Sequence, residues 1–370
     1  MKTETVKGFK DYTGEEAIRR ADIRRIVEDT FRSYGFEPAE TPVVEYADFV
    51  KGDNGRDEAV SDIFKLQDKG KRKLALRYEF TFQLKRIMKD KKLPYKRYSM
   101  GPVFRDEPIS GNRTRQFISN DLDVIGASIR DQAEVLAVAS EILKKSGING
   151  TIYINNRKLL NEILEGQGVK DKESVIREID KLDKMSEKDV KVSSKVLAMF
   201  KRPESAFKRY DSYKEIEELK KYCKLFGVDV KFLPTLARGL SYYDGNIFEI
   251  KTREIRETIF GGGAYTFSGV PSFGFGVSLE RLNAVAKMNS SRGRYLVVSL
   301  EQDEEAIALA QKLRDSGKNA SVYYGKPSKA LEYANSYNFT QVVFVGLREV
   351  KEKKFKVKDM VSGNESLLRI

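Results

Sequence analysis

Residues 101–117 read GPVFRDEPISGNRTRQF, two short apolar runs on either side of a polar segment that contains a Gly-Asn pair. This pattern predicts two antiparallel strands joined by a polar hairpin. Such strands can direct Arg105 and Gln116 to one face of a sheet, while Arg113 and Arg115 reach outward from the loop. An arginine guanidinium binds a phosphate or a carboxylate through two parallel hydrogen bonds. An anion site and an exposed basic hairpin with ordinary ion pairs both explain these residues.

The composition is that of a globular protein. The chain has 370 residues, of which 40% are apolar and 33% are charged, which is enough for two or three domains. No apolar run approaches the roughly 20 residues that span a bilayer, and the first residues contain no apolar secretion segment. We therefore expect a cytoplasmic protein that makes no membrane contact. The net charge of +13 favours a polyanionic partner such as nucleic acid.

The reactive side chains that are missing restrict the chemistry. The chain contains no histidine and a single cysteine, Cys223. A zinc site built from cysteine and histidine is therefore excluded, and so are Ser–His–Asp triads and imidazole general bases. An enzyme of this composition must use carboxylates, arginines, lysines, hydroxyls, backbone amides or a carboxylate-bound Mg²⁺.

The composition and the hydrophobic pattern of the sequence change along the chain, and these changes predict its domains. Strand-like and helical patterns alternate over residues 1–150 and return over 229–288, so we expect these two parts to form one domain. The lysine- and glutamate-rich helical patterns of 151–228 indicate an insertion into it. A polar linker at 289–293 precedes 294–370, where alternating strand and helix patterns predict a small, separate α/β domain.

A second candidate site lies where PSFGFGVSLERL (271–282) changes from a strand pattern to a helix pattern. Gly274 and Gly276 leave room for a ligand to lie flat on the sheet. Arg281 falls in the first turns of the helix, near the positive end of its dipole, which suits a phosphate. A tight packing point between strand and helix explains the same residues.

Polar residues inside apolar strand patterns form a third group of candidates. In LRYEFTF (76–82), alternation places Arg77, Glu79 and Thr81 on one face, where a carboxylate and a hydroxyl suit an ammonium group. A half-exposed strand accounts for them equally well. The three consecutive glycines of Gly261–Gly263 cost backbone entropy, which favours a place where the chain passes very close to a neighbour.

Taken together and in this order, these segments resemble a class II aminoacyl-tRNA synthetase, specifically the histidyl-tRNA synthetase family. The match covers nearly the whole chain except 151–228. The segments that carry the resemblance are TPVVEY (41–46, the dimer-interface motif), GPVFRDEP and NRTRQF (101–117, the second motif), LARGLSYYDGNIFE (236–249, the histidine signature), GGGAYTFSGV (261–270, the glycine-rich signature), PSFGFGVSLERL (271–282, the third motif) and 294–370 (the anticodon-binding domain).

The resemblance implies an α+β catalytic domain, an antiparallel sheet flanked by helices, followed by a C-terminal α/β anticodon-binding domain. The protein would be a homodimer. It would use ATP, with Mg²⁺ bound to the ATP, to convert histidine into histidyl-adenylate, and would then transfer the histidyl group to the 3′ end of tRNA(His). Because the nucleophile is the ionised carboxylate of the substrate, this reaction needs no protein base, which fits a chain without histidine.

The resemblance also implies roles for individual residues. Arg105 would contact the α-phosphate and the substrate carboxylate, Arg238 would approach the α-phosphate from the other side, and Arg281 would hold the γ-phosphate. Glu107 and Gly276 would complete the ATP site. Charge that develops on the phosphate oxygens would then be stabilised by fixed cations.

The implied histidine pocket pairs each polar group of the substrate with a side chain. Asp123 would accept from one imidazole nitrogen and Tyr243 would bond the other, because neutral imidazole offers one donor and one acceptor. Glu79 and Thr81 would surround the α-ammonium. The remaining pocket residues would be Tyr242, Tyr265 and Gly262, and the residues expected to contact the acceptor end of the tRNA are Arg113 and Arg115.

The chain departs from the family pattern at Ser241, Ser119, Ala264 and Thr266, where the family usually has an acid, a glutamine, an arginine and an acid. The three phosphate-facing arginines are present, which favours an active enzyme. The alternatives are a paralogue that regulates ATP phosphoribosyltransferase, which would lack the domain at 294–370, and a protein that binds tRNA without activating histidine.

Overall fold

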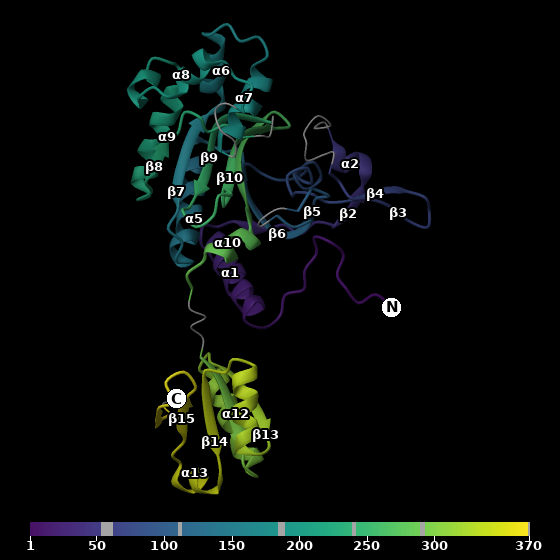
Figure 1. Ribbon diagram of the computed structural model, residues 1–370, viewed down its shortest axis with the longest axis vertical. Helices are drawn as coiled ribbons and strands as arrows, with labels where there is room; N and C mark the ends of the chain where they lie inside the picture. Colours follow the sequence, from purple (N-terminus) through teal and green to yellow (C-terminus); the bar gives the residue numbers. More distant parts are fainter. Residues whose placement is uncertain (53–61, 110–112, 184–188, 239–241, 289–292, 369–370) are drawn as a thin grey trace. The chain divides into compact units, whose positions relative to one another are not determined.

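The computed structural model describes residues 1–52, 62–109, 113–183, 189–238, 242–288 and 293–368. The chain divides into two compact units (Figure 1). The larger unit contains Met1–Asp11 and Ile23–Lys287, and the smaller one contains Tyr12–Asp22 and Met288–Ile370. Among the described residues no helix is long and apolar enough to cross a membrane.

An eight-stranded sheet forms the centre of the larger unit. Its strand order is β1-β5-β6-β11-β10-β9-β7-β8, and neighbouring strands are antiparallel except for the pairs β1–β5 and β7–β8. The strands are β1 (Glu37–Pro38), β5 (Tyr95–Phe104), β6 (Gln116–Ile125), β7 (Thr151–Asn156), β8 (Val230–Phe232), β9 (Tyr243–Lys251), β10 (Phe260–Phe267) and β11 (Val270–Ser278).

Two hairpins fix the register of the central strands. The predicted pair of strands around 101–117 is confirmed, since β5 ends at Phe104 directly opposite Gln116, the first residue of β6. Strands β10 and β11 are joined through Ser268 and Gly269, which both have positive φ, the conformation that a tight hairpin turn requires. The two hairpins meet because β11 pairs with β6.

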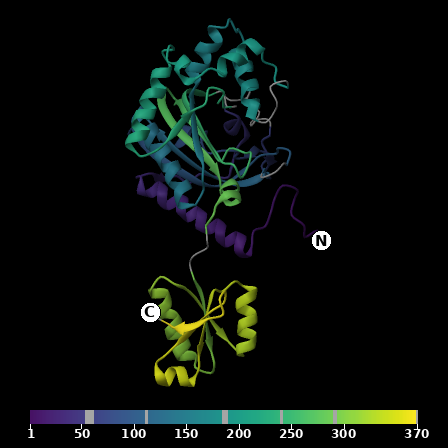
Figure 2. The ribbon, with the colours of Figure 1, turned by 60° about the vertical axis from the view of Figure 1, so that its left-hand side comes forward.

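Helices flank this sheet. A capping box at Ser128 starts α5 (Ile129–Lys145), whose buried residues include Leu136, Ile142 and Leu143 and which contacts β11 and α9. Helices α6, α7 and α8 lie together at one end of the sheet (Figure 1; Figure 2). The α-helices of the larger unit besides α5 are α1 (Gly14–Ser33), α2 (Ala47–Lys51), α4 (Leu84–Ile87), α6 (Arg157–Glu165), α7 (Lys172–Asp180), α8 (Ser194–Phe200), α9 (Tyr213–Leu225) and α10 (Leu279–Val285). Only the part of α1 from Ile23 onward belongs to this unit.

A small sheet of order β2-β4-β3 accompanies the large one. Its strands are β2 (Val44–Tyr46), β3 (Lys65–Gln67) and β4 (Lys73–Leu76). Strand β4 ends at Leu76, so the prediction that Arg77, Glu79 and Thr81 share one strand face is wrong. The Arg77 guanidinium instead donates to the carbonyl oxygens of Thr41 and Pro102, which holds this segment in an irregular path.

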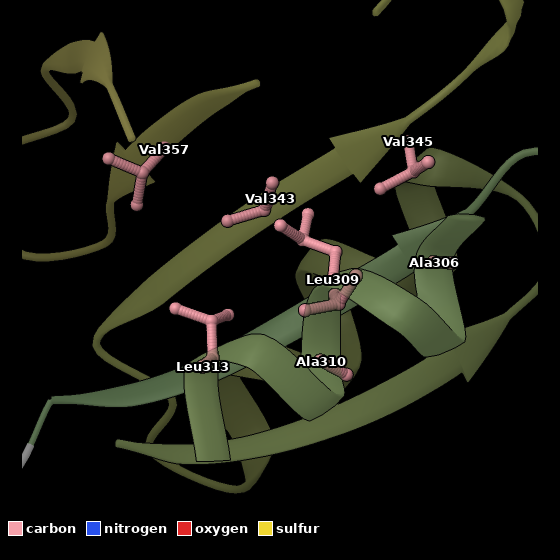
Figure 3. Packing of buried hydrophobic residues seen from close by; sticks show 8 residues of the cluster. Ala306, Leu309, Ala310, Leu313, Val343, Val345 and Val357 are labelled. Atoms are coloured by element: carbon pink, nitrogen blue, oxygen red, sulfur yellow. The ribbon is translucent and has the colours of Figure 1, made fainter. Parts of the chain in front are cut away.

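The smaller unit is built on a five-stranded sheet of order β13-β12-β14-β15-β16, in which β12 is parallel to both β13 and β14. In α11, Ala306, Leu309, Ala310 and Leu313 recur at helical spacing and pack against the valines of the sheet (Figure 3). The elements are β12 (Arg294–Ser299), α11 (Asp303–Asp315), β13 (Asn319–Tyr324), α12 (Pro327–Ser336), β14 (Gln341–Val345), α13 (Leu347–Glu352), β15 (Lys356–Asp359) and β16 (Glu365–Leu367).

Candidate active site

A cavity of about 550 Å³ opens on one face of the large sheet. All but two of the site residues expected from the sequence line it. They are Glu79, Thr81, Arg105, Glu107, Arg113, Asp123, Arg238, Tyr242, Tyr243, Tyr265, Gly276 and Arg281. These residues come from segments that are far apart in the sequence, and the strand pairing of the sheet brings them together.

Glycines form the floor of the cavity. Strand register places Asp121, Gly276, Gly261 and Glu249 in one row across β6, β11, β10 and β9. A Cβ at Gly261 would overlap the Arg238 guanidinium, and one at Gly276 would lie 3.3 Å from an Asp121 carboxylate oxygen. The Arg238 guanidinium therefore covers Gly261, and the lack of a side chain at Gly276 leaves room beside Asp121 for a flat ligand to approach the sheet.

Three guanidinium groups gather at one end of the cavity. The Glu107 carboxylate lies 3.9 Å from Arg105 and 3.6 Å from Arg113. Arg281, in the first turn of α10, donates to the carbonyl oxygen of Thr258 at 2.7 Å. Burial and then the neighbouring Arg113 and Arg105 guanidiniums lower the pKa of Arg281. Cations held close together in this way favour a polyanionic ligand.

A fourth guanidinium, Arg238, lies against the glycine floor. Its Nη1 donates to the Glu249 carboxylate at 2.6 Å, and the other Glu249 oxygen accepts from the Thr258 hydroxyl at 2.9 Å. The Nε of Arg238 is buried and has no hydrogen-bond partner among the described residues. Glu249 therefore fixes one side of the guanidinium and leaves part of its hydrogen-bonding capacity unused.

Carboxylates also line the cavity, with Arg105 close to Glu79 and Asp121. Burial raises the pKa of Glu79 to about 7, with Asp121 and Asp123 adding to the shift and Arg105 opposing it. Burial also raises the pKa of Asp121 to about 6, although the hydroxyl of Ser119 donates to this carboxylate. Negative charges held close together out of water favour a cationic ligand such as an ammonium group.

Asp123 differs from the other two acids because both of its oxygens have partners. Arg97, which is completely buried, lies 2.5 Å from one oxygen, and the Tyr265 hydroxyl donates to the other at 2.5 Å. A Cβ at Gly274 would collide with this carboxylate. The Tyr242 ring lies 4.6 Å from the Tyr243 ring, measured between centroids, and forms an apolar wall beside the acid.

Two expected site residues lie outside the cavity lining. A Cβ at Gly262 would collide with the carbonyl oxygen of Gly274, so this glycine allows close strand packing, while its neighbour Gly261 faces the cavity. Arg115 lies 3.2 Å from the Asp106 carboxylate, and its backbone N–H donates to the carbonyl oxygen of Gly8.

The four positions at which the chain differs from the family pattern lie in different environments. Ser119 lines the cavity beside Asp121, whereas the exposed Thr266 donates to Asp244. Ala264 is buried on β10. Ser241 lies outside the described residues.

Sequence reasoning missed several residues of this site. Arg97 occupies an alternate position of an apolar strand, and a charge in that pattern is the signal that could have identified it. Asp62, which follows β2 and α2, and Asp180, at the end of α7, also line the cavity. Nothing in the local sequence of either residue indicates this, because their approach to the sheet depends on packing between distant segments.

Comparison with known proteins identifies the family of the chain. The family model of histidyl-tRNA synthetase matches residues 8–282. Histidine–tRNA ligase 1 of Bacillus cereus is 33% identical over 99% of this chain and 97% of its own length, and histidine–tRNA ligase 2 of Shouchella clausii is 33% identical over 98% and 97%. The crystal structure of histidyl-tRNA synthetase from Nostoc superposes with a TM-score of 0.85 at 24% identity, covering 100% of this chain and 97% of that one. The chain belongs to the histidyl-tRNA synthetase family.

Proposed function

We propose that this protein is a histidine–tRNA ligase, which activates histidine with ATP and transfers the histidyl group to tRNA(His). The observation that carries the proposal is one cavity lined by guanidiniums, carboxylates and glycines. The guanidiniums suit a triphosphate and the carboxylates suit an amino acid with its ammonium group, and Arg105, which is close to Glu79, would bring the two reacting groups together. The relatives that the chain matches over almost their full length are histidine–tRNA ligases.

In the first step the histidine carboxylate attacks the α-phosphate of ATP, and pyrophosphate leaves. Arg105 and Arg238, which line the cavity, would hold the α-phosphate from two sides, and Arg281 would hold the γ-phosphate. The attacking carboxylate is already ionised at neutral pH, so the protein aligns the reactants and stabilises charge on the phosphate oxygens. Proton transfer to a protein base is not required.

Histidine would be selected by polar side chains of the cavity that bond its imidazole ring. Asp123, held by Arg97 and Tyr265, would accept from one imidazole nitrogen, and Tyr243 would bond the other. Glu79 and Thr81, which line the cavity with Tyr242, would surround the α-ammonium, whereas Gly262 would contribute only through the close packing of β10 on β11. A site whose polar groups are paired by the correct substrate rejects an analogue that leaves them unpaired.

Mg²⁺ would accompany ATP. The carboxylate of Glu107, between Arg105 and Arg113, is an oxygen donor of the kind that Mg²⁺ prefers, and Mg²⁺ is usually held by one or two carboxylates together with substrate phosphates and water. The bound ion would neutralise charge on the phosphate oxygens. Gly276 would lie beneath the nucleotide.

The remaining expectations extend this proposal to the whole chain. Residues 1–150 and 229–288 would form the catalytic domain, interrupted by the helical insertion at 151–228, whose first strand, β7, pairs with β9 in the same sheet. Residues 294–370 would bind the anticodon after the linker at 289–293. Arg113 and Arg115 would contact the acceptor end of the tRNA. We propose that the protein acts as a homodimer in the cytoplasm, where its tRNA substrate is used.

Pyrophosphate exchange into ATP, measured with each amino acid in turn, tests the proposal. We expect exchange with histidine alone, followed by histidylation of a tRNA(His) transcript. Exchange with no amino acid, while tRNA(His) still binds, would indicate a tRNA-binding protein without activation. Exchange with a different amino acid would overturn the assignment of the pocket and leave the activation chemistry standing.

A further inference from the structure

Asn155 is a completely buried residue near the end of β7, and its amide contacts the loop that leads to Arg238. Its Nδ2 donates to the carbonyl oxygens of Pro234 at 2.9 Å and Leu236 at 2.8 Å. Its Oδ1 accepts from the backbone N–H of Asn156 at 2.8 Å. The amide therefore bonds through both of its polar atoms, and its two donors serve a single segment.

The loop depends on these bonds because strand pairing ends before it. Strand β8 ends at Phe232, and the last backbone bond from this segment to β7 runs from the Leu233 N–H to the carbonyl oxygen of Ile154. Beyond that point the Asn155 amide takes the place of ladder hydrogen bonds. Pro234 is half-buried but Leu236 is only 2% exposed, so the Leu236 carbonyl, left without a donor, would lose its hydrogen bond without gaining one from water.

The anchored carbonyls lie close in sequence to Arg238. Leu236 precedes Arg238 by two residues, and the Arg238 side chain then reaches Glu249 on β9 and covers Gly261 on β10. Strand β9 pairs directly with β7, with Asn155 opposite Ile247. Asn155 therefore fixes the backbone that carries Arg238 relative to the strand that holds its ion-pair partner.

We propose that Asn155 is a positioning residue that acts through Arg238. The inference rests on the proposed function, in which Arg238 contacts the α-phosphate. Asn155 touches no substrate, and its amide sets the position of a guanidinium whose alignment matters in the transition state. A displacement of about 1 Å in such a group can reduce a rate by roughly 10²-fold.

The test is histidine-dependent pyrophosphate exchange by Asn155→Ala, Arg238→Ala and the double variant. We expect N155A to lose roughly 10–100-fold in kcat with a nearly unchanged KM for histidine. In the R238A background the same substitution should cause no further loss, because the group through which it acts is gone. N155S, which keeps one donor, should lose less than N155A.

Asn246→Ala is the matched control. Asn246 is a buried asparagine on β9 that bonds Asn156 and Gln132 and does not bond the loop. Full exchange activity in folded N155A, an equal loss in N246A, or a further loss when N155A is added to R238A would overturn the positioning role. If N155A fails to fold, N155S decides the question by the same comparison. Absence of exchange in the unmodified protein would instead overturn the proposed function, and the role of Asn155 with it.

Discussion

Replacement of Glu79 by glutamine tests whether burial of this carboxylate in the cavity destabilises the folded protein. Burial raises the pKa of Glu79 from 4.5 to about 7. The difference of about 2.5 between these pKa values corresponds to about 3 kcal/mol, by which folding disfavours the ionised carboxylate at pH 8. E79Q removes this charge and keeps the shape of the side chain, so it should stabilise the ligand-free protein while it weakens histidine activation.

The sign of the pH dependence follows from linkage. Because the folded pKa lies above the unfolded one, the contribution of Glu79 to stability is greatest below pH 4.5 and is lost as the pH rises through 7. The advantage of E79Q should therefore be small at pH 5 and reach its full value at pH 8. A gain of about 3 kcal/mol corresponds to roughly 5–10 °C in Tm for a unit of this size.

Thermal unfolding followed by circular dichroism at pH 5 and pH 8 measures this effect. E40Q is the matched control, because Glu40 is an exposed carboxylate of the same unit. Saturating histidine at pH 8 should raise the Tm of the unmodified protein more than that of E79Q, since the ammonium group supplies the missing counter-charge. Equal Tm values for E79Q and E40Q at pH 8, or an advantage of E79Q that persists at pH 5, would refute the reasoning.

Three other substitutions test a proposed phosphate ligand, the hydrogen bond to Asp123 and a glycine of the cavity lining. R105Q should reduce the rate of pyrophosphate exchange by roughly 10²–10³-fold, and a rate within threefold of the unmodified protein would contradict its role at the α-phosphate. Y265F removes a hydroxyl donor from Asp123 and should raise the KM for histidine by roughly 10–100-fold in the same assay; an unchanged KM would show that this hydrogen bond does not organise the pocket. G276A places a Cβ 3.3 Å from an Asp121 oxygen and should weaken the binding of ATP, measured by calorimetry, roughly tenfold. Unchanged affinity for ATP would mean that the nucleotide does not lie against Gly276.

The local pattern of the sequence was sufficient for the main strands, whereas most of the expected cavity residues came from the resemblance to histidyl-tRNA synthetases. Alternating apolar residues and a Gly-Asn turn predicted the hairpin that β5 and β6 form, because strand periodicity and turn chemistry act over a few residues. Arg105 and Arg281 were found for the same reason, since each stands at a fixed place beside a strand end or a helix start. The absence of histidine directed attention to arginines and carboxylates, whose roles remain a proposal.

The tertiary structure decided which side chains meet across the sheet. Gly261 faces the cavity and Gly262 does not, and this choice depends on the pairing of β10 with β9 and β11, in which a shift of one residue would exchange the two faces. Arg97 finds Asp123 on the next strand, and Asn155 finds the backbone of a loop some 80 residues later in the chain. Such contacts join segments that local patterns describe separately. The sequence alone therefore determined which residue types could do the chemistry, and strand register and loop packing determined where each of them acts.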